Sequence, residues 1–235
     1  MRAKLFRKNP NQVAQFDRNE DVAIFARRPP HLEYRLPCAE HCVRQRQSAE
    51  FGIAEARKQE RAEQLIRDTL RDLPHYANTG SAFAEGYRSI GDSITGDEHY
   101  INWAYLSDGR ILDSKHPESL VYEMRNGKKT LVAAMYMLEL GSTFADVPDV
   151  GGALTQWHVH NNLCLVDDPN DPLRKYVALP SNGTCPAGSS KATATPMIHV
   201  WIVKNACGPF ASLEGIGAGQ VPPGETRNCD TAHGS

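Results

Sequence analysis

Two histidines separated by a single residue, His158 and His160, are the first candidates for chemistry in this chain. In an extended strand, side chains repeat every two residues, so both imidazoles would share one face while Trp157 and Val159 point the other way. Adjacent imidazoles can occupy neighbouring positions around a transition metal. The alternative is a pair of polar histidines on a solvated strand, and an H-x-H pair alone does not exclude it.

His199 favours the metal because its neighbours are apolar. It lies in the run Ile198-His199-Val200-Trp201, which predicts a buried strand. A buried imidazole needs partners for both ring nitrogens, and a metal ion plus one hydrogen bond supplies them. The competing interpretation is a core histidine bonded to a backbone carbonyl.

Two residues earlier in the chain are candidates to complete the coordination shell. His99 begins an expected strand, and Glu118 opens one arm of an expected hairpin. A carboxylate on an apolar face is costly unless something compensates it. The predicted ligands of a single metal ion are therefore His158, His160 and His199, completed by Glu118 or His99.

The residue types leave the identity of the metal open, since imidazole with one carboxylate accepts Zn, Mn, Fe, Cu or Ni. An open coordination position would make the protein a metalloenzyme that activates water or O₂ for a small-molecule substrate. A closed shell would indicate a non-catalytic metal-binding or metal-stabilised module. The third alternative is a disulfide-stapled interaction domain without metal. The residues expected to line a substrate pocket are Tyr100, Trp103, Tyr122, Trp157 and Trp201.

Composition sets limits on the partners and on the number of domains. The 235 residues suit one medium domain with an arm, or two small domains. A formal charge of -2 provides no field that favours nucleic acid or an anionic membrane. The longest apolar run, around Leu131–Leu138, is too short for a membrane span. Basic residues occur in Met1–Pro10 without the apolar segment of a signal peptide. Nothing here predicts an oligomeric state.

The cysteines favour disulfides. Segments rich in glycine, proline, asparagine and serine in the C-terminal third carry Cys164, Cys185, Cys207 and Cys229. Loop cysteines in even number suit an oxidising compartment, so we expect an extracytoplasmic or secreted protein, although buried free thiols are the alternative. Cys38 and Cys42, with His41 between them, lack a second ligand pair at zinc-finger spacing.

The elements that position these residues follow from periodicity. Residues 1–47 are polar and aperiodic, which predicts an extended or poorly ordered arm. Helical spacing of apolar residues predicts a helix over Ser48–Leu73, and a shorter one over Ser81–Tyr87. We therefore expect a helical segment over 48–90 and a metal-binding β-domain over 91–235. The buried stripe of the first helix should be Ala62, Leu65, Ile66, Thr69, Leu70 and Leu73.

Strand patterns dominate the rest of the chain. The Asn-Gly pair at 126–127 predicts a two-residue hairpin turn between arms Glu118–Arg125 and Lys128–Leu138. That register places Glu118 opposite Met135 on the more apolar face. Further strands are predicted over His99–Leu106, Thr155–Val166 and Met197–Lys204, with a long polar loop over Asp167–Pro196.

The predicted fold class is α+β, with the helical segment packed on a mainly antiparallel β-barrel or sandwich. Three histidines and a carboxylate inside a small antiparallel barrel is the arrangement found in cupins. In cupins the H-x-H pair and a glutamate share one motif, whereas the first glutamate after His160 is Glu214. The architecture is therefore cupin-like by analogy only.

Four motifs, in order, resemble those of a widespread family of bacterial proteins that has no settled activity. The family pattern is H-Y-x-N, then P-E-x-L-V-Y-E, then H-V-W, then G-x-F-A. The resemblance covers roughly residues 78–235, and the first 47 residues lie outside it. It implies that His99, Glu118 and His199 are positions of the family pattern, while the segment 157–160 is similar to that of a subgroup. It implies no reaction.

Overall fold

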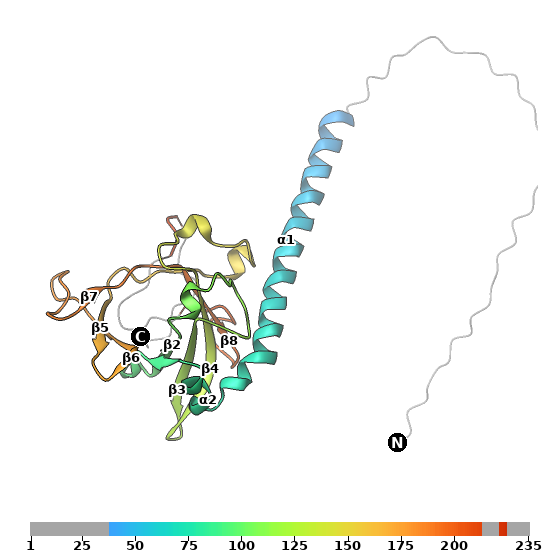
Figure 1. Ribbon diagram of the computed structural model, residues 1–235. Helices are drawn as coiled ribbons and strands as arrows, with labels where there is room; N and C mark the ends of the chain where they lie inside the picture. The colour runs from blue at the N-terminus through green and yellow to red at the C-terminus, as the bar shows by residue number, and fades with distance from the viewer. Residues whose placement is uncertain (1–37, 213–220, 225–235) are drawn as a thin grey trace, which may run out of the picture. The chain divides into compact units, whose positions relative to one another are not determined.

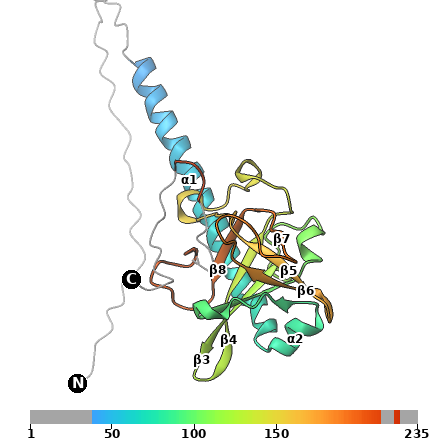
Figure 2. The ribbon, with the colours of Figure 1, turned by 90° about the vertical axis from the view of Figure 1, so that its left-hand side faces the viewer.

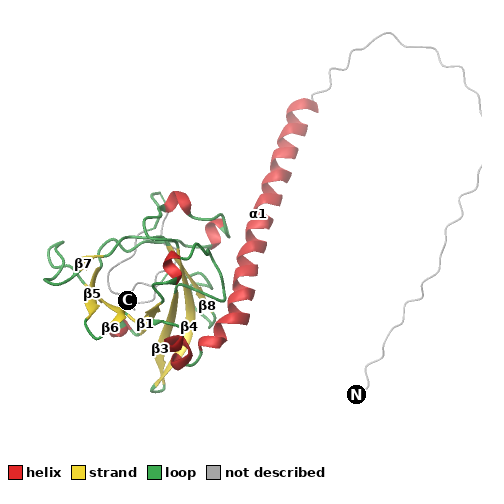
Figure 3. Ribbon diagram, viewed as in Figure 1, coloured by secondary structure: helices red, strands yellow, loops and turns green. Residues whose placement is uncertain are grey.

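The structure, a computed structural model, describes residues 38–212 and 221–224 (Figure 1). The chain divides into two compact units, Met1–Val43 and Arg44–Ser235, and the fold described below is that of the second unit. A helix precedes two mainly antiparallel sheets, so the predicted α+β class is confirmed at this level (Figure 3). The first 37 residues of the predicted arm lie outside the described residues.

Helix α1 spans Cys38–Asp72 and therefore begins before the predicted Ser48. A 3₁₀ turn over Leu73–Tyr76 ends it, because proline at the second position of that turn cannot donate the next helical hydrogen bond. The buried stripe is confirmed at its centre but is narrower than predicted, since Leu70 is 47% exposed. The short helix α2 spans Thr79–Ala84, and Asn78 caps its start by accepting from the Gly80 N–H.

The first sheet has five strands in the order β1-β2-β3-β4-β8, each antiparallel to its neighbours. Figure 2 labels β3, β4 and β8 of this sheet. The predicted hairpin is confirmed, because Asn126 and Gly127 adopt the left-handed φ angles of 51° and 76° that a tight two-residue turn requires. The strand bounds are Arg88–Ser89, Asp97–Ile101, Ser119–Arg125, Lys128–Met137 and Met197–Trp201.

The second sheet has three strands in the order β6-β5-β7. They span Asp171–Ala178, Cys164–Asp168 and Ser190–Lys191. The predicted long loop over Asp167–Pro196 is therefore wrong. Strand β6 is polar and only partly buried, so its sequence lacks the apolar alternation that marks a strand.

Two other predicted strands are shorter than expected. Strand β2 ends at Ile101 because the Asn102 side chain accepts from the Ala104 N–H and turns the chain toward a 3₁₀ turn at Tyr105–Ser107. The strand predicted over Thr155–Val166 is reduced to the start of β5 and one isolated bridge at His158.

A disulfide joins Cys164 to Cys185, as the loop cysteines predicted. It ties the start of β5 to the segment that leads to β7. Cys207 is also disulfide-bonded. Cys229 lies outside the described residues.

The two sheets contact each other where β1 lies beside β6. The Val177 N–H of β6 donates to the Ile90 carbonyl beside β1, and Arg88 forms an ion pair with Asp171. At the far edge of the first sheet, His158 bridges to β8 and the chain then runs on to β5. Within the described residues neither sheet closes on itself, so the predicted cupin-like barrel is not confirmed.

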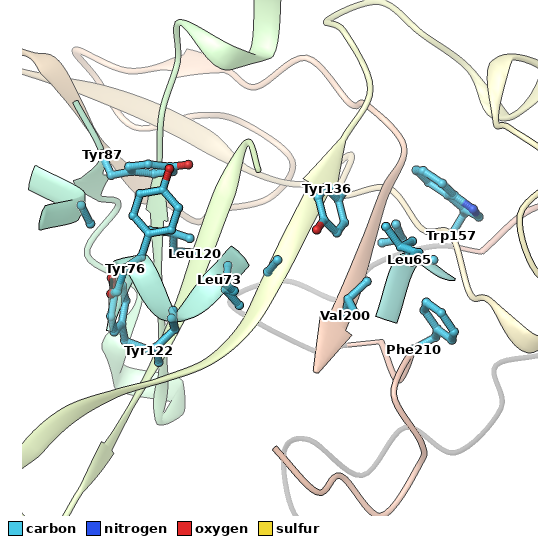
Figure 4. Packing of buried hydrophobic residues seen from close by; sticks show 14 of the residues in the cluster. Leu65, Leu73, Tyr76, Tyr87, Leu120, Tyr122, Tyr136, Trp157, Val200 and Phe210 are labelled. Carbon is cyan, nitrogen blue, oxygen red and sulfur yellow. Dashed lines mark hydrogen bonds between the residues drawn. The ribbon is translucent and has the colours of Figure 1, made fainter. Parts of the chain in front are cut away.

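Each face of the first sheet covers a separate apolar cluster. On one face, Val200 lies near Leu65 of α1, whereas Leu120 and Tyr122 lie near Tyr76 of the 3₁₀ turn (Figure 4). The Thr69 hydroxyl of α1 lies 2.7 Å from the Tyr136 hydroxyl and also donates to the Leu65 carbonyl. The opposite face holds a second cluster around Val121, Ala133, Met135, Met137, Met197 and Trp201.

A β-bulge in β4 decides which residues belong to which face. Tyr122 pairs with Leu131 as predicted, but Val121 pairs with Ala133, which leaves Val132 as an extra residue. Ser119 consequently pairs with Met135, and Glu118 comes opposite the next residue of β4. The prediction that Glu118 and Met135 share a face is therefore wrong, because one inserted residue moves the side chains beyond it to the other side.

Glu118 is buried on the α1 side of the sheet, only 1% exposed. One carboxylate oxygen accepts from the Met137 N–H at 2.9 Å, and the other has no hydrogen-bond partner among the described residues. Burial disfavours the charged form and raises the pKa of Glu118 to about 7.

We predict that Glu118→Gln removes a loss of stability that the wild-type protein shows as the pH rises from about 4.5 to about 7. With its pKa raised in the folded state, the carboxyl contributes stability below its usual pKa of 4.5, and that contribution is lost as the pH rises through about 7. One pKa unit corresponds to about 1.4 kcal/mol, so wild type should lose about 3 kcal/mol of unfolding free energy across this range. Urea unfolding at several pH values measures the difference.

Glu123→Gln on the same strand is the matched control. Its carboxylate pairs with Arg125 at the surface, so its removal should change the unfolding free energy by less than about 1 kcal/mol. If the unfolding free energies of wild type and Glu118→Gln depend equally on pH, the raised pKa of Glu118 is contradicted.

Candidate functional site

Four histidines from distant parts of the chain lie in ring contact on the face of the first sheet that is turned away from α1. The rings of His158 and His199 are 5.2 Å apart, those of His99 and His199 are 5.6 Å apart, and those of His158 and His160 are 5.4 Å apart between centroids. We call these four residues the histidine cluster. All four come from the predicted ligand set, and their role as ligands stays a prediction.

Strand register places three of these side chains together. His199 of β8 pairs with Met135 of β4, so both emerge on the same face. His158 and Met197 exchange two backbone hydrogen bonds of 3.0 and 2.9 Å, which puts His158 directly beside β8. His160 follows two residues later and points to the same side, as the H-x-H spacing predicts.

His99 reaches the cluster across two intervening strands. β3 and β4 separate β2 from β8, and in a flat sheet this spacing would put the two backbones about 14 Å apart. The Nε2 atoms of His99 and His199 are nevertheless 3.3 Å apart. The two imidazole side chains therefore lean toward each other across β3 and β4, and the small side chain of Ala133 leaves room between the rings.

Asp92 fixes the orientation of His99. One oxygen of its carboxylate accepts from the His99 backbone N–H at 2.9 Å, and the other lies 2.6 Å from Nδ1 of the ring. Both side chains are buried. Burial alone would lower the pKa of His99, but the Asp92 carboxylate outweighs burial and raises it above its usual value. A carboxylate on the far nitrogen is the usual support of a metal-binding histidine, since it aims the other nitrogen outward.

His199 is as deeply buried as His158, each 1% exposed. Burial, followed by the proximity of His158 and His99, holds its pKa well below the usual value, so the ring is neutral. Its Nδ1 has no hydrogen-bond partner among the described residues. Whichever of His99 and His199 donates across the 3.3 Å contact, one nitrogen of His199 is left unsatisfied, which is costly in a buried site.

The 3.3 Å separation of the two Nε2 atoms is compatible with a hydrogen bond and also with two ligands of one metal ion. Two nitrogens on a tetrahedral ion with bonds of 2.0–2.1 Å are about 3.4 Å apart.

The other two histidines are not aimed at the same point. The ring of His158 lies 14° from parallel to that of His199, so the two are stacked face to face. As the side chains stand, no group of three or more His, Cys, Asp or Glu in the described parts of the chain is placed to hold a metal ion. Binding by His158 and His160 would require their rings to turn.

The structure separates Glu118 from the histidine cluster. Its cross-strand neighbours on β4 place it on the α1 face, whereas His199 shares the opposite face with Met135. The carboxylate that does approach a histidine is Asp92, which the sequence analysis missed. It lies in a loop seven residues before His99, and no motif spacing marks such a pair.

A cavity of about 270 Å³ lies between the two sheets and adjoins the histidine cluster. His99, His160 and Asp92 form part of its wall. A cavity of about 150 Å³ already holds benzene, so this one can enclose a small organic molecule. The wall also includes the apolar residues Ile101, Trp103, Met135, Met137, Leu165 and Met197.

The predicted aromatic lining is largely wrong. Of the five predicted residues, only Trp103 lines this cavity. Tyr122 and Trp157 belong instead to the apolar cluster that packs against α1. The cavity is lined instead by Met135 and Met137 of β4 and by Met197 of β8. The spacing of two residues between Met135 and Met137 places both on one face of a strand, and this spacing is visible in the sequence.

Comparisons with protein-family models, with characterised proteins and with solved structures find no match.

We predict that Asp92→Asn destabilises the protein even without metal. The substitution weakens two hydrogen bonds to a buried carboxylate, and bonds to charged groups contribute roughly 1.5–3 kcal/mol each. The unfolding free energy in the presence of a chelator should fall by about 2 kcal/mol.

Asp113→Asn is the matched control, since Asp113 pairs at 2.8 Å with His116 in a partly exposed position. Its loss should cost less than about 1 kcal/mol. If both substitutions lower the unfolding free energy equally, the buried Asp92–His99 pair contributes no more stability than the surface Asp113–His116 pair.

Proposed function

We propose that this protein is a metal-dependent enzyme that acts on a small apolar molecule. The proposed ligands of a single transition-metal ion are His99, His158, His160 and His199. The observation that carries the proposal is the 3.3 Å contact between the Nε2 atoms of His99 and His199, with Asp92 holding the far nitrogen of His99. Glu118 is not part of this set. The likeness to cupins is limited to histidines on the inner side of antiparallel strands.

The adjoining cavity favours an enzyme over a purely structural metal site. His99 and His160 both contribute to the cavity wall, so one side of the histidine cluster faces space that a substrate can occupy. A metal ion held there would supply Lewis-acid activation of water or of dioxygen. The protein itself orients His99 through Asp92 and surrounds the site with apolar walls, which exclude bulk water and strengthen local electrostatic interactions.

A non-catalytic metal-binding module is the second candidate. It is favoured by the burial of His158 and His199, each 1% exposed, which places half of the histidine cluster away from solvent. Both candidates predict metal binding, and only the enzyme requires that the cavity accept a ligand. The Cys164–Cys185 disulfide favours an oxidising compartment for the protein under both candidate functions.

Among the described residues no helix is both long and apolar enough to cross a membrane.

We predict that the purified protein binds one transition-metal ion per chain. His99→Gln and His199→Gln should each lower the affinity about 100-fold or more, because each removes one of the two nitrogens that already face each other. Elemental analysis after purification without chelator, followed by titration with Zn, Cu, Fe, Mn and Ni, measures this.

His75→Gln is the control, since His75 also contacts a carboxylate, that of Glu85 at 2.6 Å, but lies at the surface. It should bind metal like wild type. Wild-type protein that takes up none of these metals would overturn the proposed function.

We also predict that small apolar molecules such as indole or naphthalene bind in the cavity and raise the melting temperature. Leu165→Trp should abolish this effect by filling the space while leaving metal affinity within about threefold, which also shows that the variant is folded. Leu173→Trp, at a position 47% exposed on β6, is the matched control. A ligand effect that survives in Leu165→Trp would place the binding site elsewhere and favour the non-catalytic module.

A further inference from the structure

A lysine stands on the face of the second sheet that lines the cavity. Leu165 of β5 pairs with Val177 of β6, and Lys175 lies two residues before Val177. Side chains two residues apart in a strand share a face, so Lys175 emerges on the same side as Leu165 and Val177. All three residues line the cavity, which makes this the side of the sheet that is turned toward the first sheet. Lys175 is therefore a cation on an otherwise apolar wall.

The ion-pair partner of Lys175 is not part of the cavity lining. The ammonium group contacts the carboxylate of Asp167, whose side chain is 80% exposed. Ion pairs of this kind are weak, because water competes for both charges. An ammonium group also has three N–H donors, so the contact with Asp167 leaves donors for a second acceptor. Lys175 can therefore bind a ligand oxygen without first losing Asp167.

Trp103 shows where the ammonium group lies relative to the cavity. The Lys175 Nζ is 5.9 Å from the centre of the Trp103 ring, and both residues line the cavity. This distance is at the outer limit of a cation–π contact, so the ammonium group lies beside the ring without being bound tightly to it. The indole N–H of Trp103 has no hydrogen-bond partner among the described residues and is a second donor in this wall.

The two parts of the cavity differ in character. The side chain of Lys175 is 35% exposed, so its charge lies at the outer edge. Leu106, Met135 and His99 are only 2–6% exposed and form the inner, mainly apolar part. Asp92 also contributes to the wall, but its carboxylate already accepts from the His99 backbone and lies against the His99 ring. The cavity is thus suited to a molecule with one apolar end and one anionic end.

We propose that the cavity binds an apolar monocarboxylate, with its carboxylate on Lys175 and its hydrocarbon body against the buried apolar wall. This inference rests on the cavity of the proposed function and adds the chemical class of the substrate. The hydrocarbon body gains free energy by leaving water. The carboxylate stays at the outer edge, where a charge-assisted hydrogen bond from the ammonium group replaces the water that it loses. The apolar end of the ligand then lies toward His99.

The same arrangement excludes related molecules. A neutral molecule of equal shape gains only the burial of its hydrocarbon body. A dicarboxylate with charges at both ends would bury one of them among apolar side chains, which is costly without a partner. The cavity is therefore expected to distinguish ligands by the number of their charges as well as by their size.

The test compares 2-naphthoate with 2-naphthamide, a neutral molecule of nearly the same shape. Calorimetric titration should show that wild type binds 2-naphthoate about tenfold more tightly or better, because only the carboxylate forms a charge-assisted hydrogen bond with Lys175. The difference should be the same for protein as purified and for protein with a chelator. A preference that disappears with the chelator would assign the carboxylate to a metal ion and overturn the role of Lys175.

Lys175→Gln should lower the affinity for 2-naphthoate about tenfold, the effect of losing a hydrogen bond to a charged group. Its affinity for 2-naphthamide should stay within about threefold of wild type, which also shows that the variant is folded. Asp167→Asn should raise the affinity for 2-naphthoate by about threefold, because it removes the carboxylate that competes for Lys175, and should leave 2-naphthamide unaffected.

Lys191→Gln is the matched control. Lys191 is also a residue of the cavity wall, but in β7 it pairs with Cys164 rather than with Leu165. Its side chain therefore belongs to the opposite face of the second sheet. This variant should bind both ligands within about threefold of wild type.

The outcomes separate this inference from the proposed function. Wild-type protein that binds neither ligand, or both equally, would overturn the inference, as would a loss of 2-naphthoate affinity in Lys191→Gln instead of Lys175→Gln. An equal loss of both ligands in Lys175→Gln, with no gain in Asp167→Asn, would also overturn it. Metal uptake by such a protein would leave the metal site in place. Selective binding of 2-naphthoate by a protein that takes up no metal would keep this inference and overturn the proposed metal-dependent enzyme.

Discussion

Strand β4 contains one residue more than β3 between the hairpin turn and the centre of the sheet, and this residue, Val132, determines the composition of both faces. Side chains alternate along a strand, so the extra residue reverses the alternation for everything beyond it. Without the bulge, Glu118 would lie beside Met135 and close to His199. With it, the carboxylate is buried beneath α1, and the opposite face keeps histidine, methionine and alanine.

The two faces of the first sheet are consequently packed against different elements. The α1 face is stabilised by large apolar side chains and by tyrosines whose hydroxyls find partners, as with Tyr136 and Thr69, or Tyr122 and the Tyr76 carbonyl. In the described structure the cavity face is covered by the second sheet rather than by a helix. Buried polar atoms without a hydrogen-bond partner among the described residues occur on both faces, at Glu118 and Trp157 on the α1 side and at Ser119 and His199 on the cavity side.

Much of this arrangement follows from short-range sequence signals, and the remainder depends on distant contacts. The Asn-Gly turn predicted the hairpin, the H-x-H spacing predicted that His158 and His160 share one face, and apolar neighbours predicted that His199 is buried. The bulge was not predictable, because nothing in the run Leu131 to Ala133 distinguishes the inserted residue from its neighbours. Asp92 was missed because its role depends on how a loop folds back onto β2. Strand β6 was missed because it is held by pairing with β5 rather than by an apolar pattern of its own.

The attachment of His158 and His160 has a consequence for how quickly the histidine cluster can be reached from solvent. His99 and His199 belong to strands paired within the five-stranded sheet, so moving them requires disrupting that sheet. His158 is joined to Met197 of β8 by two backbone hydrogen bonds in an isolated bridge outside the named strands. A single bridge opens locally at a lower free energy than the paired strands of a sheet. The proposed metal ion would therefore exchange through movement of the segment that carries His158 and His160, while His99 and His199 keep their geometry.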